Sequence, residues 1–153
     1  MLTKKGLLLF LLILFTGSVL RITGIKWGLM TSKYFHAAAY HPDESEMLKA
    51  YQGMRPRKLD FRLRTETVQL KGTFHPYLMA VWIKTASLFN LVKISSSFEH
   101  YKTEPKELVK LYVTGRSMSV FFGILTVILL FFLAKVFYDD YKIGLLSAFL
   151  LAI

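Results

Sequence analysis

Two adjacent carboxylates, Asp43 and Glu44, are the residues of this sequence best suited to chemistry, and they lie in the stretch YHPDESEM at residues 40–47. A carboxylate can act as a general base on a hydroxyl or an amine, or bind a divalent cation such as Mg²⁺ or Mn²⁺ through its oxygens. Acidic residues also stabilise the first turn of a helix, and Pro42 fits a first-turn position. From these residues alone, a reactive pair and a helix start are both open interpretations.

A second short motif, TFHPYL at residues 73–78, places a histidine before an apolar run. His75 could donate a hydrogen bond to a phosphate oxygen or lie among polar head groups, and the sequence does not decide between the two. Lys84 falls inside the apolar run, where a cation is a candidate functional residue unless its long side chain reaches the membrane surface. Lys71 adds a basic side chain just before the motif, and His41 stands beside the Asp-Glu pair.

Apolar helices must position these residues, because 54% of the 153 residues are hydrophobic and they cluster in long runs. A membrane-spanning helix needs about 20 mostly apolar residues. The runs lie at about 6–25, 76–94, 117–138 and 143–153, and the last is incomplete where the sequence stops. The predicted fold is an all-α polytopic membrane protein, a transmembrane helix bundle with an outer loop at about 26–75 that carries amphipathic juxtamembrane helices.

The first apolar run fits either a retained helix or a cleaved signal peptide. We favour the retained helix, because the run is long and no A-x-A cleavage site follows it closely. Arg21 lies near its far end, where a long side chain is expected to reach the membrane interface. The sequence contains no cysteine, which excludes thiolate zinc sites and cysteine nucleophiles.

Charge predicts how the spans are oriented. The net charge is +10 and the basic residues lie between apolar runs, which favours anionic lipid head groups or phosphate-bearing substrates over nucleic acid. Lys4 and Lys5 precede the first run and predict a cytoplasmic N-terminus, with Asp43 on the outer face. Alternation of the spans then places Arg116 on the cytoplasmic face and returns Asp139 to the outer face.

The order of the motifs resembles the polytopic glycosyltransferases of the GT-C superfamily, and within it the family 39 branch of protein O-mannosyltransferases and aminoarabinose transferases. In that family an Asp-Glu pair opens the first outer loop, an HPPL-like motif begins the next span, and an Arg followed by a Gly opens the third. Here HPDE, HPYL and the pair Arg116 and Gly123 occupy those places. Tyr77 replaces the second Pro, and Ala80 stands where a Lys often follows in protein-mannosylating members, which leaves the acceptor open.

The resemblance implies transfer of a hexosyl or pentosyl group from a polyprenyl-phosphate donor to a lipid, glycan or protein, on the outer face of a bacterial plasma membrane and with inversion. Asp43 would be the general base, and Glu44 would orient it or the acceptor. Either carboxylate, Asp43 first, would hold Mg²⁺ or Mn²⁺ in members that use a metal, and no other cofactor is implied. His75, with Lys84 or Lys71 behind it, would bind the leaving phosphate.

The likeness covers nearly the whole chain but only the N-terminal part of such an enzyme, so these residues alone are expected to be inactive. Within that picture His41 shapes the helix start and contributes to substrate binding. The rival interpretation is a non-enzymatic polytopic membrane protein, such as a transporter or an assembly subunit. In such a protein HPDE would be only a helix cap.

Overall fold

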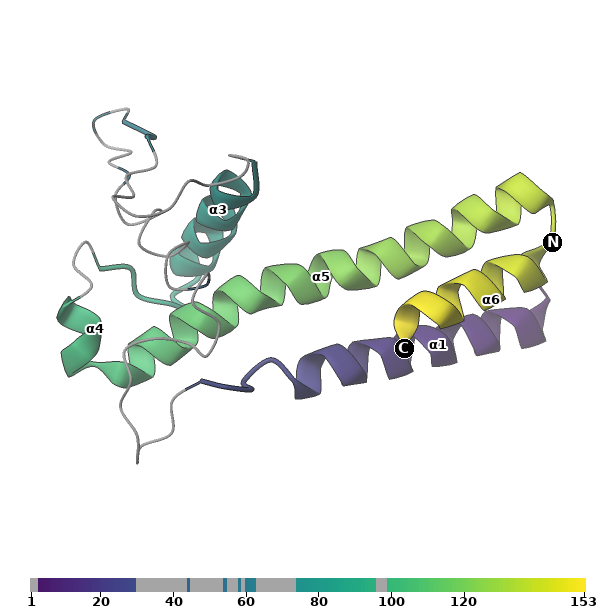
Figure 1. The fold of residues 1–153 in the computed structure, drawn as a ribbon, viewed down its shortest axis with the longest axis horizontal. Helices are drawn as coiled ribbons and strands as arrows, with labels where there is room; N and C mark the ends of the chain where they lie inside the picture. Colours follow the sequence, from purple (N-terminus) through teal and green to yellow (C-terminus); the bar gives the residue numbers. More distant parts are fainter. Residues whose placement is uncertain are drawn as a thin grey trace. The chain divides into compact units, whose positions relative to one another are not determined.

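The computed structural model describes residues 3–29, 44, 54, 58, 60–62, 74–95 and 99–153. Every regular element in this part of the chain is a helix, as the sequence predicted. The helices are α1 (Lys4–Thr23), α3 (Phe74–Leu88), α4 (Glu99–Thr103), α5 (Pro105–Tyr138) and α6 (Tyr141–Ala152) (Figure 1). Two of them, α1 and α5, are long and apolar enough to cross a membrane by length and composition.

The chain divides into two compact units. The bundle unit consists of Met1–Ile25 and Ser117–Ile153, and the loop unit consists of Lys26–Arg116. Helix α5 therefore gives its first turns to the loop unit and its apolar remainder to the bundle unit.

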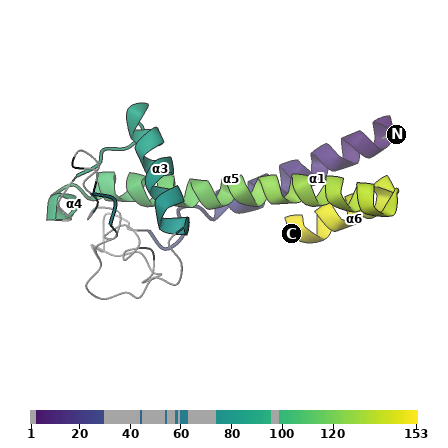
Figure 2. The same ribbon diagram turned by 90° about the horizontal axis from the view of Figure 1, so that it is seen from above.

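In the bundle unit, α1 runs antiparallel to the apolar part of α5. Near its beginning, α1 stacks Phe10 on Phe131 with ring centroids 4.1 Å apart. Near its end, Arg21 lies against Gly123, eight positions earlier in α5, where an added Cβ would be 3.1 Å from the Arg21 Nε. Helix α6 turns back after Asp140 and contacts α1, beside which it lies in Figure 1. Figure 2 shows α6 running back from the end of α5.

This antiparallel arrangement corrects the order of ends expected from the sequence. Alternating spans at 6–25, 76–94 and 117–138 would make the first and third parallel, with Asp139 at the opposite end from Lys4. Instead, the turn at Asp139 lies at the end of the bundle unit where α1 begins. The first and third apolar runs are therefore antiparallel and not parallel within the bundle unit.

Small residues make the closest backbone approaches between helices of the bundle unit. Gly144, Ala148 and Ala152 form a buried stripe along α6. A Cβ on Gly144 would lie 2.8 Å from the carbonyl oxygen of Phe131, and one on Gly17 would lie 3.0 Å from the Cβ of Ala152. These positions allow the backbones of neighbouring helices to approach closely.

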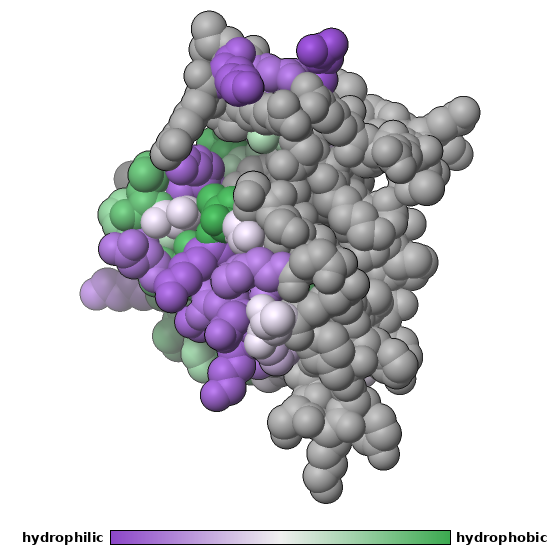
Figure 3. Space-filling view, turned by 90° about the vertical axis from the view of Figure 1, so that its left-hand side faces the viewer, coloured by the Kyte–Doolittle hydropathy of each residue, from purple (hydrophilic) through white to green (hydrophobic). Residues whose placement is uncertain are grey.

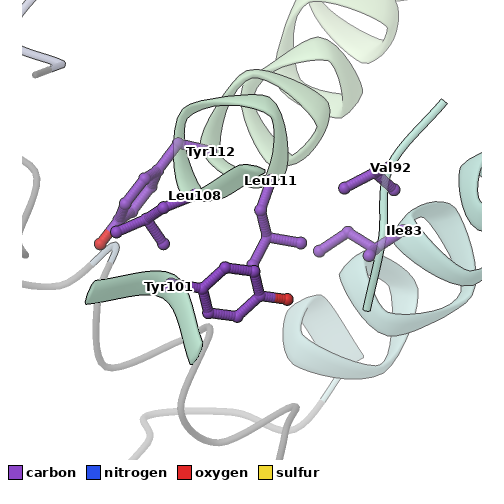
Figure 4. Packing of buried hydrophobic residues seen from close by; sticks show 6 residues of the cluster. All are labelled: Ile83, Val92, Tyr101, Leu108, Leu111 and Tyr112. Atoms are coloured by element: carbon purple, nitrogen blue, oxygen red, sulfur yellow. The ribbon is translucent and has the colours of Figure 1, made fainter. Parts of the chain in front are cut away.

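The loop unit packs α3 and α4 on the first turns of α5. Its described surface is largely hydrophilic on the side where α4 and the start of α5 lie, with hydrophobic side chains next to them (Figure 3). The core is made of large residues: Ile83, Val92, Tyr101, Leu108, Leu111 and Tyr112 (Figure 4). The Tyr101 hydroxyl accepts a hydrogen bond from the Ser95 N–H at 2.9 Å and donates to the Lys93 carbonyl at 3.1 Å.

Helix α3 has 15 residues and ends well before the end of the predicted span 76–94. Asn90 adopts the left-handed conformation with a φ of 57°. The Leu91 N–H donates to the Ala86 carbonyl at 3.1 Å and the Asn90 N–H to the Ser87 carbonyl at 3.1 Å. This is the Schellman arrangement that closes a helix, with Asn in the position usually held by Gly.

Candidate functional site

Three of the six predicted site residues can be located. Glu44, His75 and Lys84 belong to the part of the chain that the structure describes. The other three, His41, Asp43 and Lys71, lie outside the described residues, so the proposed base itself stays a prediction.

Glu44 forms a two-pronged ion pair with Arg116, 72 positions later in the sequence. The Arg116 Nε donates to Oε1 at 2.9 Å, and Nη2 donates to Oε2 at 2.8 Å. Both side chains are largely shielded from solvent, with 31% of Glu44 and 18% of Arg116 exposed. Arginine matches a carboxylate in this parallel geometry, and such charge-assisted bonds fix orientation as well as position.

A third bond ties the same guanidinium to the segment that follows α1. The Arg116 Nη1 donates to the carbonyl oxygen of Trp27 at 2.6 Å. The next residue, Gly28, has a φ of 69°, a conformation that side-chain-bearing residues rarely adopt. Leu29 then packs against the core of the loop unit. Arg116 thus joins the exit of α1, the start of the outer loop and α5.

The beginning of α5 holds Arg116 in place. Leu108, Leu111 and Tyr112 are buried in the core, and they fix the helix on its inner side. Arg116 lies four residues after Tyr112, so it projects near the same side of the helix. Its position is therefore set by packing, and Glu44 is set by Arg116.

The expectation that Arg116 anchors α5 on the face opposite to the Asp-Glu pair was wrong, because Arg116 contacts Glu44 directly. The signal that could have found the contact was present: an arginine near the start of a long apolar run, in a chain with an acidic pair after its first run. Spacing alone did not show that the two meet.

The pairing limits what Glu44 can do chemically. Both of its oxygens already accept hydrogen bonds from one cation. A carboxylate in this state is better suited to holding the local backbone in place than to acting as a general base.

His75 and Lys84 do not converge. Both are exposed on α3, but they are nine residues apart. At 100° and 1.5 Å per residue, they lie on opposite sides of the helix and about 13 Å apart along it. One phosphate cannot be held by both side chains of this helix at once. The structure therefore separates His75 and Lys84, which the sequence analysis assigned to the same leaving phosphate.

Gly123, the other residue of the resemblance on α5, makes room for Arg21. The Arg21 guanidinium donates to the carbonyls of Gly17 at 3.1 Å, Ala152 at 2.8 Å and Leu151 at 2.8 Å. The Arg21 side chain thus turns toward α6. Gly123 is therefore explained by packing within the bundle unit.

Among the residues that the structure describes, no three His, Asp or Glu side chains come together in a way that could hold a metal ion. The proposed metal ligand Asp43 lies outside these residues. Comparison of the whole chain with known proteins found no match to a family model, to a curated protein or to a solved structure.

Proposed function

We propose that this chain is part of a membrane glycosyltransferase of the GT-C type, similar to family 39, that transfers a sugar from a polyprenyl-phosphate donor to a lipid, glycan or protein acceptor. The ion pair between Glu44 and Arg116 carries the proposal. It brings into contact two parts of the sequence pattern that the resemblance links and that lie 72 positions apart. A helix cap at HPDE would not require an arginine from α5.

The packing of the bundle unit supports insertion into a bilayer. Glycine and alanine allow its helices to approach closely, while several large apolar side chains face outward, among them Leu8 at 70%, Leu133 at 66% and Val136 at 79% exposure. A water-soluble helical bundle would bury such side chains. Outward-facing leucine over small-residue contacts is the pattern of helices that lipid surrounds.

Charge supports one orientation of that bundle. Lys4, Lys5, Lys135 and Lys142 all belong to the end of the bundle unit where α1 begins. Basic residues flanking spans favour the cytoplasmic face, whereas acidic residues contribute little. The loop unit is then on the outer face, and its own basic residues are no objection, because long connections of more than about 60 residues follow the rule less strictly.

In the proposed reaction, the acceptor oxygen or nitrogen attacks the anomeric carbon of the donor as the bond from that carbon to the phosphate oxygen breaks. The configuration inverts, the acceptor proton passes to Asp43, and polyprenyl phosphate leaves. Arg116 holds Glu44, and Glu44 holds the local backbone that presents Asp43. His75 or Lys71 supplies a donor or positive charge to the leaving phosphate.

The test is transfer by the full-length protein in vesicles, using polyprenyl-phosphate donors that carry radiolabelled hexoses or pentoses. We expect Asp43→Asn to lower transfer about 100-fold or more, the usual contribution of a general base. Glu46→Gln is the matched control, because it removes a nearby carboxylate outside the Asp-Glu pair. Transfer that survives Asp43→Asn at the native rate would refute the assigned base.

The non-enzymatic alternative also accommodates this ion pair, because a carboxylate with both oxygens bonded to an arginine can hold the fold without any part in catalysis. This alternative makes a different prediction. The native protein would transfer sugar from none of the donors, and Arg116→Gln would only reduce its stability.

A further inference from the structure

We propose that the whole loop unit lies on one side of the membrane, and that α3 does not cross the bilayer but rests in its surface with Phe74, Tyr77, Val81 and Leu88 against lipid. The proposal rests on the membrane insertion inferred above and is independent of sugar transfer.

The direction of α1 and α5 determines at which end of the bundle unit the loop unit is attached. Because α1 and the apolar part of α5 are antiparallel, Ile25 and Ser117 lie at the same end of the bundle unit. If both helices span the membrane, the chain between them must cross an even number of times. The sequence from Lys26 to Thr73 contains no apolar run that could supply a second crossing beside α3.

Helix α3 is short compared with the thickness of a bilayer. Its 15 residues extend about 22 Å at 1.5 Å per residue, shorter than the hydrocarbon core of about 30 Å. The closing turn at Asn90 ends the helix before the remaining residues of the predicted span can extend it. Helix α3 is therefore too short to cross on its own.

The packing of α3 on α5 places it at the depth of the head groups. Met79 lies 3.9 Å from where a Cβ on Gly115 would be, and Ile83 shares a core with Leu111. Gly115 precedes Ser117, where the apolar run begins, by two residues or about 3 Å of helix. A helix packed there lies where α5 enters the membrane.

Helix α3 is apolar both on its buried side and on its exposed side. Pro76 and Ile83 are buried, with Met79 and Ala86 turned to the same core. The opposite side is also apolar, with Phe74 at 77%, Val81 at 63% and Leu88 at 70% exposure. A helix at the surface of a water-soluble unit carries polar residues there.

The residues around this outer side fit a membrane surface. Phe89 and Leu91 extend the apolar side beyond the helix, at 73% and 66% exposure. Lys84 and Lys93 are exposed as well and can meet anionic head groups. Lipid therefore suits both the apolar and the basic side chains.

The sidedness test uses the absence of cysteine from the sequence, which makes single-cysteine variants unambiguous. Lys58→Cys, Lys93→Cys and Asp139→Cys would be introduced into the full-length protein and exposed to a membrane-impermeant maleimide in sealed vesicles. We expect residues 58 and 93 to be labelled from the same side and residue 139 from the other. Labelling of residue 93 from the side opposite to residue 58 would show that α3 crosses and would overturn the proposal.

Labelling of all three residues from one side would instead refute membrane insertion of α1 and α5, and with it the basis of this inference. Neither result depends on sugar transfer, so a failure here is distinguishable from a failure of the enzymatic proposal.

The depth test places an environment-sensitive fluorophore at Val81→Cys, with Glu104→Cys as the control on an exposed residue outside α3. Lipids that carry a nitroxide near the head group should quench the probe at residue 81 several-fold more than lipids with the nitroxide deep in the chain, and more than they quench residue 104. Absence of quenching at residue 81 would mean that protein and not lipid covers this side. Stronger quenching by the deep label would indicate a crossing. Either result contradicts the proposal.

Discussion

In the bundle unit, Gly17, Gly144 and Ala148 make close contacts between helices beside the stacked rings of Phe10 and Phe131, and leucines such as Leu8 and Leu133 point away from the protein. In the loop unit the buried contacts are made by large residues, such as the completely buried Ile83 and Leu108. Water favours burial of large apolar groups, whereas lipid is as apolar as leucine and leaves close packing as the driving force. One chain thus contains two packing regimes, which meet along α5.

The basic side chains of the two units differ in the kind of partner that they bind. Arg21 in the bundle unit donates to backbone carbonyls of α1 and α6. Arg116 in the loop unit pairs with a carboxylate, and Lys110 pairs with Glu107 at 2.8 Å. Carbonyl partners satisfy a guanidinium without bringing a second charge into an apolar region.

A charge placed on the outward side of the bundle unit should have the largest effect of the changes that test the difference between the two units. Leu129 is 58% exposed and lies near the middle of the apolar run of α5. Leu129→Lys should disfavour insertion by about 3 kcal/mol if lipid surrounds this residue, and alkaline carbonate should then extract much of the protein from membranes. Thr103→Lys, an exposed change in the loop unit, is the control. Equal extraction of both variants would mean that the bundle unit faces water.

Removing Arg116 should have the next largest effect. Arg116→Gln leaves the partly shielded Glu44 carboxylate without its cation, and we expect the free energy of unfolding in detergent to fall by about 2 kcal/mol, between the values for exposed and buried pairs. The double variant with Glu44→Gln should recover part of that loss. The pair of Arg62 and Asp60, in which 83% of the arginine but 15% of the aspartate side chain is in solvent, serves as the reference and should show a smaller coupling than the Glu44 pair, about 1 kcal/mol or less. Additive single effects at residues 44 and 116 would contradict the coupling.

The sequence predicted the helices well and the direction of the spans poorly. The run 6–25 became α1 and the run 117–138 became the apolar part of α5, because unbroken apolar runs determine helices locally. The segment 76–94 has a similar composition, but one residue, Asn90, ends its helix early. Whether a short apolar helix crosses or packs depends on its partners, such as Leu111, and those contacts are not encoded in its own composition.

The candidate site was predictable in the same partial way. An acidic pair after an apolar run indicated Glu44 as a residue of interest, and the resemblance indicated Arg116. Their contact depends on tertiary packing across 72 positions, which a single sequence does not show. His75 and Lys84 were grouped because they are near in sequence, but helix geometry separates them.

A methyl group added at Gly144 tests whether close backbone approach stabilises the bundle unit. Its Cβ would lie 2.8 Å from a backbone oxygen of α5, so the helices must move apart. We expect Gly144→Ala to destabilise the bundle by a net of about 1–2 kcal/mol, despite the better helix propensity of alanine. Gly24→Ala meets nothing within 4 Å at a φ of −81° and should be neutral or slightly stabilising. Thermal unfolding in mild detergent compares the two, and equal shifts would exclude close packing at Gly144.

The smallest predicted effect lies in the core of the loop unit. The fully buried Tyr101 joins the Lys93 carbonyl and the Ser95 N–H through one hydroxyl, and so fixes the segment after α3 to α4. Tyr101→Phe keeps the ring in the core but leaves both backbone groups without this partner, which should cost about 1 kcal/mol. Tyr77→Phe, on the outer side of α3, is the matched control. Hydrogen exchange at the Ser95 amide should accelerate in the first variant and stay unchanged in the second. Equal exchange would show that ring packing alone holds this segment, and the contrast between the two units would then be one of side-chain size and not of hydrogen bonding.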